Sequence, residues 1–256
     1  MLTQIQRDRI EVVLVSPHNP LNIGAAARAM ANFGVSRLSV VKPFARTWRE
    51  ARSAVGAPDL LLNAKETTTL AGAITDCTLV IGTGSLNYRK PQQQAVSLPD
   101  LAPLVSRELA QGGRVAVVFG TESHGMTGDD LTFCHVLVEI PTDARQPSMN
   151  LGQAVAVCLY ELATRVTAPE QTETNEELSS EQGKPSVRSG SLDLLAGLIE
   201  ETMHAAGYSP NSMQEANRHD LRLFLRRIHL SEKDVRRILG LFRRILWRLH
   251  RAAKVG

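Results

Sequence analysis

Residues 115–125 read Val-Ala-Val-Val-Phe-Gly-Thr-Glu-Ser-His-Gly, an apolar run that passes directly into a polar loop. The arrangement returns at residues 136–152, where Val-Leu-Val-Glu-Ile precedes Pro-Thr-Asp-Ala-Arg-Gln-Pro-Ser-Met-Asn-Leu-Gly. A short β-branched run that gives way to polar residues with Gly and Pro predicts a buried strand followed by a loop. Because parallel sheets bind ligands at the carboxyl ends of their strands, we interpret the two loops as parts of one pocket.

Apolar runs alternate with helix-like segments throughout the first 165 residues. The predicted strands cover residues 10–15, 38–41, 78–82, 114–119 and 136–140, and the predicted helices cover residues 23–33, 48–53, 68–74, 101–111, 128–134 and 151–164. This alternation predicts an α/β fold with a mostly parallel sheet. The strands are nearly continuous apolar runs, which indicates that both faces of the sheet are buried.

The composition is that of a globular protein, with 43% hydrophobic and 21% charged residues among 256. No apolar run approaches the roughly 18 residues that a membrane span needs, and residues 1–9 have no signal-peptide core behind them. The three cysteines, Cys77, Cys134 and Cys158, lie in apolar stretches without metal-ligand spacing. We therefore predict buried free thiols, a reducing cytoplasm, no membrane association and no metal site.

A polar segment divides the chain. Residues 169–190 contain almost no large apolar side chain, so they predict a flexible linker between a domain of residues 1–168 and a unit of residues 191–256. This last unit holds 12 Lys and Arg against 7 Asp and Glu, whereas residues 1–170 hold 15 of each kind. The net charge of +3 therefore arises at the end of the chain, which suggests a polyanionic partner.

The final unit predicts a small all-α structure of three helices, over residues 191–206, 213–228 and 232–251. Ser191 is a candidate N-cap for the first helix, and Ser231 with Asp234 resembles a capping box for the third. A helical wheel places six arginines on one half of the third helix, namely Arg236, Arg237, Arg243, Arg244, Arg248 and Arg251. A solvated face on a self-packed unit would account for them, but they also suit nucleic-acid phosphates, and we predict that contact.

The first predicted strand leads into Ser-Pro-His-Asn-Pro-Leu-Asn-Ile-Gly-Ala-Ala-Ala-Arg, residues 16–28. Asn22 is a candidate N-cap for the helix that follows. Arg28 lies six residues further along, in a helix of small apolar residues. It is either a surface residue whose stem packs on the helix or a positioned functional group, and the residues alone leave both possibilities open.

Two other patterns suggest familiar chemistry, which their context disfavours. Val-Ile-Gly-Thr-Gly-Ser, residues 80–85, looks like a dinucleotide-binding turn, but residues 86–94 predict an irregular loop where that motif requires a helix. The loop more plausibly lines the pocket, with Arg89 and Lys90 as an exposed basic pair. His124 and Ser148 could suggest a hydrolase, yet Ser148 lacks the Gly-x-Ser-x-Gly elbow and no acid partner is identifiable. His18 and His135 are isolated, and we expect structural roles for them.

Taken together, three segments resemble the motifs of the ribose 2′-O-methyltransferases of the SPOUT superfamily. They are Asn22 with Arg28, Phe-Gly-Thr-Glu-Ser-His-Gly at 119–125, and Ile-Pro…Pro-Ser-Met-Asn-Leu at 140–151. The resemblance implies a deep trefoil knot over about residues 119–165, which no periodicity could reveal because threaded chains are rare. It also implies S-adenosylmethionine as cofactor and a homodimer, in which Arg28 of one subunit could serve cofactor bound by the other.

The C-terminal unit resembles the extension of TrmJ-type tRNA methyltransferases. This likeness implies methylation of a cytidine or uridine ribose in the tRNA anticodon loop, at tRNA position 32. By position in the motifs, the cofactor contacts would come from Thr83, Gly84, Ser85, Gly120, Ile140, Pro147, Ser148 and Met149. The RNA contacts would come from Arg89, Lys90, Arg236, Arg237, Arg243, Arg244 and Arg248.

The resemblance also suggests catalytic roles. Arg28 would act on the ribose hydroxyl, and because a guanidinium stays charged in proteins we expect it to orient the hydroxyl or a phosphate rather than to act as a base. Asn22, Glu122, Ser148 and Asn150 would hold Arg28 and the loop in place. Two alternative functions remain. One is methylation of ribosomal RNA or of another tRNA site, since a basic face reads phosphate rather than sequence. The other is a non-catalytic RNA-binding protein on the same fold, which the presence of all five catalytic candidates disfavours.

Overall fold

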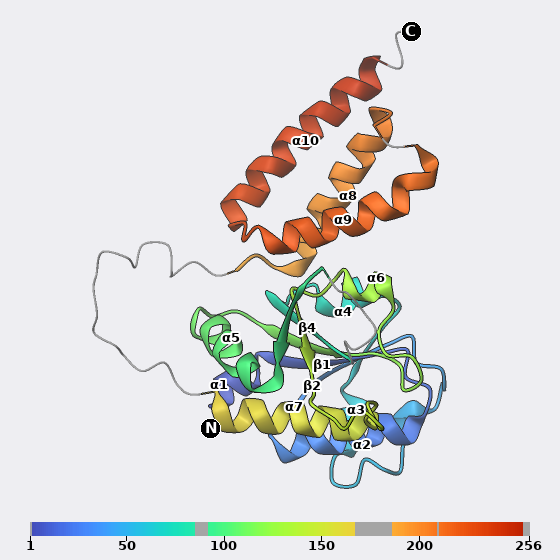
Figure 1. Cartoon of the computed structure of the whole chain (residues 1–256), viewed down its shortest axis with the longest axis vertical. Helices are drawn as coiled ribbons and strands as arrows, with labels where there is room; N and C mark the ends of the chain where they lie inside the picture. Colours follow the sequence, from blue (N-terminus) through green and yellow to red (C-terminus); the bar gives the residue numbers. More distant parts are fainter. Residues whose placement is uncertain (1, 85–91, 167–185, 209, 253–256) are drawn as a thin grey trace, which may run out of the picture.

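The computed structural model describes residues 2–84, 92–166, 186–208 and 210–252, and in them a parallel sheet forms the centre of the molecule (Figure 1). The order of the seven strands is β3-β2-β1-β6-β4-β7-β5, and every pairing is parallel. The strands are β1 (Ile10–Val15), β2 (Arg37–Val41), β3 (Lys65–Thr67), β4 (Leu79–Thr83), β5 (Gln94–Ser97), β6 (Val115–Phe119) and β7 (Val136–Glu139). The predicted α/β class and parallel sheet are confirmed.

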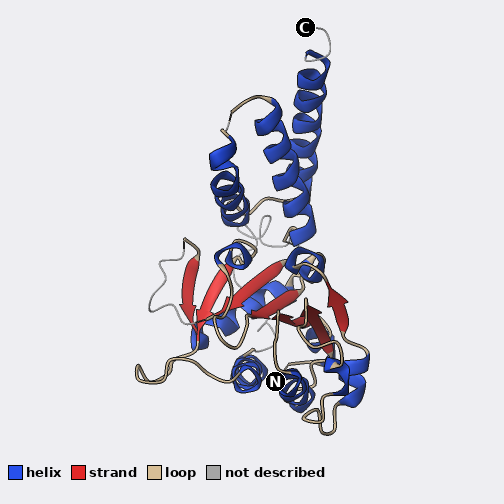
Figure 2. Ribbon diagram, turned by 90° about the vertical axis from the view of Figure 1, so that its right-hand side faces the viewer, coloured by secondary structure: helices blue, strands red, loops and turns tan. Residues whose placement is uncertain are grey.

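Helices cover both faces of this sheet, as Figure 2 shows. The helices of this domain are α1 (Gln4–Arg7), α2 (Pro20–Asn32), η1 (Trp48–Glu50), α3 (Pro58–Leu62), α4 (Leu70–Ile74), α5 (Leu98–Ala110), α6 (Gly128–Leu131) and α7 (Leu151–Arg165). Side chains alternate between the two faces of a strand, so Val12 and Leu14 pack under α2, α5 and α7, while Val13 and Val15 pack under α4 and the segment after α6. Both faces are therefore apolar, which explains why the strands read as continuous apolar runs.

The sequence did not predict the two edge strands, β3 and β5, whereas it predicted the bounds of the five inner strands to within one residue. Lys65, Glu66, Gln94 and Ala95 are all exposed, so β3 and β5 lack the apolar pattern that marks a buried strand. β5 begins inside the segment that we expected to be an irregular loop, at Gln94. Residues 85–91, with Ser85, Arg89 and Lys90, lie outside the described residues.

The last strands of the domain are inserted between earlier ones. β6 lies between β1 and β4, and β7 lies between β4 and β5. After β7 the chain crosses to α7, which packs on α2 and α5 (Figure 1). The contact with α2 is close, because a Cβ atom added to Gly152 would lie 2.6 Å from the Cβ of Ala25. The two loops quoted first thus follow β6 and β7, which lie on either side of β4.

Residues 186–252 form a helical unit that stands on the face of the domain bearing α4 and α6 (Figures 1 and 2). Its helices are α8 (Ser189–Ala205), η2 (Asn211–Met213), α9 (Gln214–Arg227) and α10 (Glu232–Ala252). Its core contains Val187, Leu192, Leu195, Ala196, Leu225, Val235 and Leu239. In α10 the predicted capping box is present, with Asp234 N–H donating to Ser231 Oγ at 3.2 Å and Ser231 N–H to Asp234 Oδ2 at 3.1 Å.

The start of this unit differs from the prediction. α8 begins at Ser189 rather than with Ser191 as its N-cap, because the free N–H groups of Ser189 and Gly190 donate to the carbonyls of Cys77 (2.8 Å) and Thr75 (3.1 Å). Residues 186–190, which we assigned to a flexible linker, are instead packed against the sheet domain. Residues 167–185 lie outside the described part of the chain.

Candidate active site

The carboxylate of Glu122, in the loop after β6, accepts hydrogen bonds from polar groups of the predicted pocket. Glu122 accepts hydrogen bonds from the backbone N–H groups of His18 (3.0 Å) and Asn19 (3.1 Å) and from Asn22 Nδ2 (3.0 Å). Asn22 Oδ1 in turn accepts from Asn150 Nδ2 at 2.9 Å. These contacts join residues 100 to 128 positions apart, so the three motifs meet at one point at the carboxyl ends of the strands.

The capping residues differ from the prediction in a way that explains this network. The N-cap of α2 is Asn19, whose side chain accepts from Leu21 N at 2.9 Å, and Pro20 follows it at the first helical position. Asn22 is therefore inside the first turn and not the cap, which leaves its amide free to join Glu122 and Asn150. Asn150 itself caps α7 through its Oδ1.

The protonation state of Glu122 follows from these contacts. Burial alone would raise the pKa of the carboxyl, but hydrogen bonds from the His18 backbone, the Asn22 side chain and the Asn19 backbone outweigh it, so the pKa of Glu122 lies below its ordinary value. His18 Nδ1 lies 3.6 Å from the carboxylate. Glu122 is thus an anion at neutral pH that orders the loop, and a carboxylate already holding three donors is poorly suited to accept a proton from substrate.

The loop that carries Glu122 folds back tightly on itself. Thr121 and Gly125 exchange two backbone hydrogen bonds, of 3.1 and 2.9 Å, and Gly125 has a φ of 67°. Gly120 tolerates no side chain, because an added Cβ would lie 2.0 Å from the carbonyl carbon of Gly125 and 2.2 Å from Met126 N. Glycine at both positions is therefore required by the backbone itself.

The described cofactor candidates lie at or beyond the carboxyl ends of three adjacent strands, β6, β4 and β7. Thr83 Oγ1 donates to the Val118 carbonyl at 3.0 Å, and Gly84 N–H donates to the Val138 carbonyl at 3.2 Å, so the end of β4 is fixed between its neighbours. Among the described residues, nothing lies within 4 Å of a Cβ added to Gly84.

The loop after β7 completes this edge of the sheet. Ile140, Pro147 and Met149 are half-buried, whereas Ser148 is exposed. The loop is braced by Thr142 Oγ1, which donates to the Pro147 carbonyl at 3.1 Å. Backbone groups on Gly- and Pro-rich loops, next to half-buried apolar side chains, fit a bent ligand with both polar and apolar parts.

Arg28 does not join the other catalytic candidates in this chain. It is exposed on α2, and six residues of helix turn it about 120° away from Asn22. Within the described residues its guanidinium has no hydrogen-bond or ion-pair partner. The structure therefore brings Asn22, Glu122 and Asn150 together, leaves Ser148 on the rim of the loop and directs Arg28 outward.

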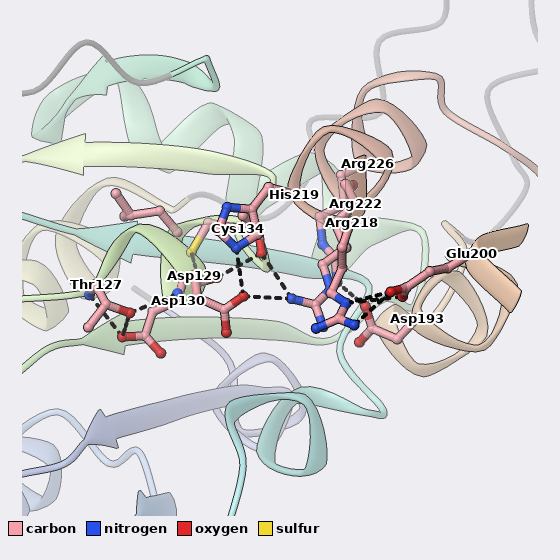
Figure 3. Close-up of polar contacts among 12 residues, drawn as sticks. Thr127, Asp129, Asp130, Cys134, Asp193, Glu200, Arg218, His219, Arg222 and Arg226 are labelled. Carbon is pink, nitrogen blue, oxygen red and sulfur yellow. Dashed lines mark hydrogen bonds and ion pairs between the residues drawn. The ribbon is translucent and has the colours of Figure 1, made fainter. Parts of the chain in front are cut away.

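The arginines of the helical unit fall into two sets. On α9, Arg218, Arg222 and Arg226 extend toward the carboxylates of Glu200, Asp129 and Asp193, at 2.6, 2.8 and 2.7 Å (Figure 3). We call these three the docking arginines. On α10, Arg236, Arg237, Arg243, Arg244 and Arg248 are exposed, and no carboxylate of the described chain pairs with them. We call these five the open arginines.

Two of the docking arginines, Arg222 and Arg226, hold the helical unit on α6 and the segment after it, whereas Arg218 pairs with Glu200 within the unit. Arg226 is only 5% exposed, and its Nε donates to the Phe133 carbonyl at 3.0 Å. Arg222 lies over the Phe133 ring, with its Cζ 4.2 Å from the centroid. His219 Nε2 is 3.1 Å from Asp129 Oδ1. Sequence reasoning missed this interface, because nothing in a row of arginines tells a phosphate ligand from a partner for carboxylates elsewhere in the fold.

Other predicted features can be placed directly. Cys77, Cys134 and Cys158 are free and buried, as predicted, and burial raises the pKa of each thiol to about 12. His135 is structural, as expected: its Nδ1 accepts from Val80 N–H at 3.0 Å. Among the described residues there is no cluster of three metal-ligating side chains. Nor does any helix there have the length and apolar character needed to cross a membrane.

Comparisons with known proteins agree with this geometry. A model of the SpoU rRNA Methylase family matches residues 9–160. A tRNA (cytidine/uridine/adenosine-2′-O-)-methyltransferase, TrmJ, of Pseudomonas aeruginosa is 35% identical over 78% of this chain and 79% of its own. An uncharacterized tRNA/rRNA methyltransferase, LasT, of Escherichia coli is 31% identical over 89% of this chain and 99% of its own. The crystal structure of TrmJ from Z. mobilis superimposes with a TM-score of 0.77 at 25% identity, over 92% of this chain and 98% of that one.

Proposed function

This chain belongs to the SpoU rRNA Methylase family, and we propose that it methylates a ribose 2′-hydroxyl of tRNA with S-adenosylmethionine as methyl donor. The observation that carries the proposal is the junction at Glu122, where the motifs around Asn22, Glu122 and Asn150 meet. The tRNA substrate is supported by the TrmJ relative, which shares 35% of its residues with this chain over most of both lengths. By the same resemblance, the target is a cytidine or uridine in the anticodon loop.

The cofactor would lie at the ends of β4, β6 and β7. The residues that would contact it are Thr83, Gly84, Ser85, Gly120, Ile140, Pro147, Ser148 and Met149. When bound, S-adenosylmethionine supplies a methyl group on a positively charged sulfur, which is open to attack by an oxygen. The chain's part is to hold this group in line with the ribose oxygen, and such positioning can lower a barrier by about 7–11 kcal/mol.

Arg28 would act on the RNA. Its guanidinium would donate hydrogen bonds to the 2′-oxygen or to a neighbouring phosphate, which orients the hydroxyl and stabilises the negative charge that develops as its proton leaves. The outward direction of Arg28 supports a homodimer in which it reaches the pocket of the other subunit. Asn22, Glu122 and Asn150 would act as positioning residues that hold the loops of residues 119–125 and 140–150 in a fixed position relative to each other.

We also propose a knotted fold, a cytoplasmic location and a surface that binds RNA phosphates. A deep trefoil knot over about residues 119–165 is supported by the insertion of β6 and β7 between earlier strands and by the packing of α7 on α2. A cytoplasmic location is supported by three cysteines that remain free thiols. The open arginines, with Arg89 and Lys90, would bind the phosphates of tRNA.

Methylation of another RNA is the second candidate, and one observation favours it. The relative from Escherichia coli, aligned over 99% of its length, is named a tRNA/rRNA methyltransferase. The two candidates separate in one experiment. Purified protein is incubated with radiolabelled S-adenosylmethionine and either unmodified tRNA transcripts or ribosomal RNA, and the product is mapped by mass spectrometry. We expect 2′-O-methylation of an anticodon-loop pyrimidine. Label in ribosomal RNA alone would reject the tRNA assignment, and no label in either RNA would reject the enzyme.

A further inference from the structure

One aromatic side chain lies among the arginines of α10. Trp247 follows Arg244 by three residues and precedes Arg251 by four, so the three share one face of the helix. The guanidinium carbons of Arg244 and Arg251 lie 4.7 and 5.4 Å from the centroid of the indole ring. An indole in this setting is a flat apolar surface bordered by positive charge.

Core packing among the described residues does not account for this tryptophan. Trp247 is 45% exposed and is absent from the core of the helical unit. The chain's other tryptophan, Trp48, is fully buried, and its indole N–H donates to Glu66 at 3.2 Å. A half-exposed indole among cations suits a binding surface, because Trp is enriched at interfaces and single-stranded nucleic acids stack on aromatic rings beside basic residues.

Gly240, on the same face of α10, also indicates a binding surface. Gly240 precedes Trp247 by seven residues, which is about two helical turns. Glycine within a helix is less stable than alanine there, so a reason for it is expected. A Cβ added to Gly240 would meet nothing within 4 Å, so the chain's own packing gives no such reason. A bare stretch of helix backbone would, however, let a phosphodiester chain approach closely.

We propose that Trp247 stacks on an unpaired base of the bound RNA, while Arg244 and Arg251 contact the phosphates beside it. Stacking on an aromatic ring requires a base that is exposed in a loop, bulge or single strand, because bases inside a duplex already stack on each other. The C-terminal end of α10 points away from the sheet domain (Figure 1), so within one chain this contact is separate from the proposed cofactor pocket. The inference rests on the proposed function and adds a specific contact to it.

Tryptophan fluorescence tests the stacking directly, because Trp48 is buried and Trp247 is the exposed indole. The full chain is titrated with an unmodified tRNA transcript and, separately, with heparin, a polyanion that has no bases. We expect tRNA to quench the emission of Trp247, and heparin to compete for binding without that quenching. The Trp247→Phe variant identifies the signal, since only the emission of Trp48 remains in it. Equal responses to tRNA and heparin, or no response to tRNA, would overturn the proposal.

Affinity measurements on matched variants provide the second readout. We expect Trp247→Ala and Trp247→Leu to weaken tRNA binding about tenfold with an unchanged salt slope, and Trp247→Phe to keep most of the affinity. The matched control is Leu241→Ala, which removes another exposed apolar side chain of α10 from outside this face. Wild-type affinity in Trp247→Ala would reject the stacking. Failure of the wild-type protein to methylate tRNA would reject the proposed function instead, because quenching by tRNA is measured without turnover.

Discussion

The docking arginines of α9 and the open arginines of α10 look alike in the sequence and differ in the structure. Each docking arginine has a carboxylate partner within the protein, and Arg226 is almost completely buried. The open arginines are exposed, and one of them, Arg244, lies over the indole ring of Trp247 instead of beside a carboxylate. A basic composition therefore gives only an upper limit for the phosphate-binding surface, because part of the charge holds the helical unit on its domain.

The interactions of the two sets of arginines should also differ in their dependence on salt. Arg226 and Asp193 are shielded from salt and depend on each other, because a buried charge without a partner is costly. The open arginines are screened by salt and contribute little to folding, but each releases counterions when it meets a phosphate. Substitution should consequently affect stability in one set and RNA binding in the other.

The largest effect is expected at Arg226. Replacing it by methionine leaves Asp193 partly buried without its cation, and we expect the free energy of unfolding to fall by about 3–5 kcal/mol. Urea denaturation measures this, with Arg237→Met on α10 as the control that should change it by less than about 0.5 kcal/mol. The double variant Arg226→Met with Asp193→Leu should recover most of the loss. If both single variants were equally stable, the distinction between the two sets would be wrong.

Arg28 extends the comparison, because it too is exposed and without a partner among the described residues. We expect Arg28→Ala to lower kcat about a hundredfold with cofactor affinity unchanged, since it removes a donor to developing charge. Arg28→Lys should remain well below wild type, because lysine lacks the planar pair of donors. Single-turnover methylation of tRNA measures both. Arg237→Ala, assayed at saturating tRNA, is the control that keeps the normal rate. Near-normal turnover by Arg28→Lys would eliminate a specific guanidinium role.

We expect the stability of the fold to depend on pH through His135, which lies near the docking arginine Arg226. Burial, with the nearby charges of Arg226 and His229, lowers the pKa of His135 to about 3 from its usual 6.5. Between these values the unfolded chain binds the proton and the folded chain does not, so stability is intact above pH 6.5 and falls as the pH decreases toward 3. From pH 7 to pH 5 the loss from this group is about 2 kcal/mol.

Denaturation of wild type and of His135→Gln across this pH range isolates that contribution. The variant keeps an acceptor for Val80 N–H and should lose less stability on acidification. The exposed His250→Gln serves as the control and should follow wild type. Parallel curves for wild type and His135→Gln would mean that other groups determine the acid sensitivity.

The smallest effect is expected at a single open arginine. Arg244→Gln should reduce the slope of log affinity for tRNA against log salt by roughly one unit, as one phosphate contact is lost. The matched variant Arg218→Gln, on α9, should leave the slope unchanged because Glu200 already holds that guanidinium. Filter binding over a range of salt concentrations compares the two. Equal changes in slope would mean that α9 also contacts RNA.

The sequence was most informative where local patterns match the final contacts. The inner strands were located because both of their faces are apolar, and the motifs around Glu122 could be aligned because their polar residues are close together in the chain. Asn22 was misassigned as a cap because Asn19 before Pro20 offers the same capping chemistry three residues earlier. The partners of Arg222 and Arg226 could not be predicted, because the contacts join residues about 90 positions apart. Trp247 could have been noticed from the wheel alone, as an aromatic residue among arginines.

The anchoring of residues 186–190 has a consequence for protein engineering. The helical unit is positioned by the carbonyls of Thr75 and Cys77 and by Asp129, all of which belong to the folded domain, and not by the length of the chain that leads to it. Loop length changes a closure entropy only slowly, by about 0.6 kcal/mol for each doubling. These contacts should therefore hold the helical unit on its domain even when the chain is cut between residues 166 and 186.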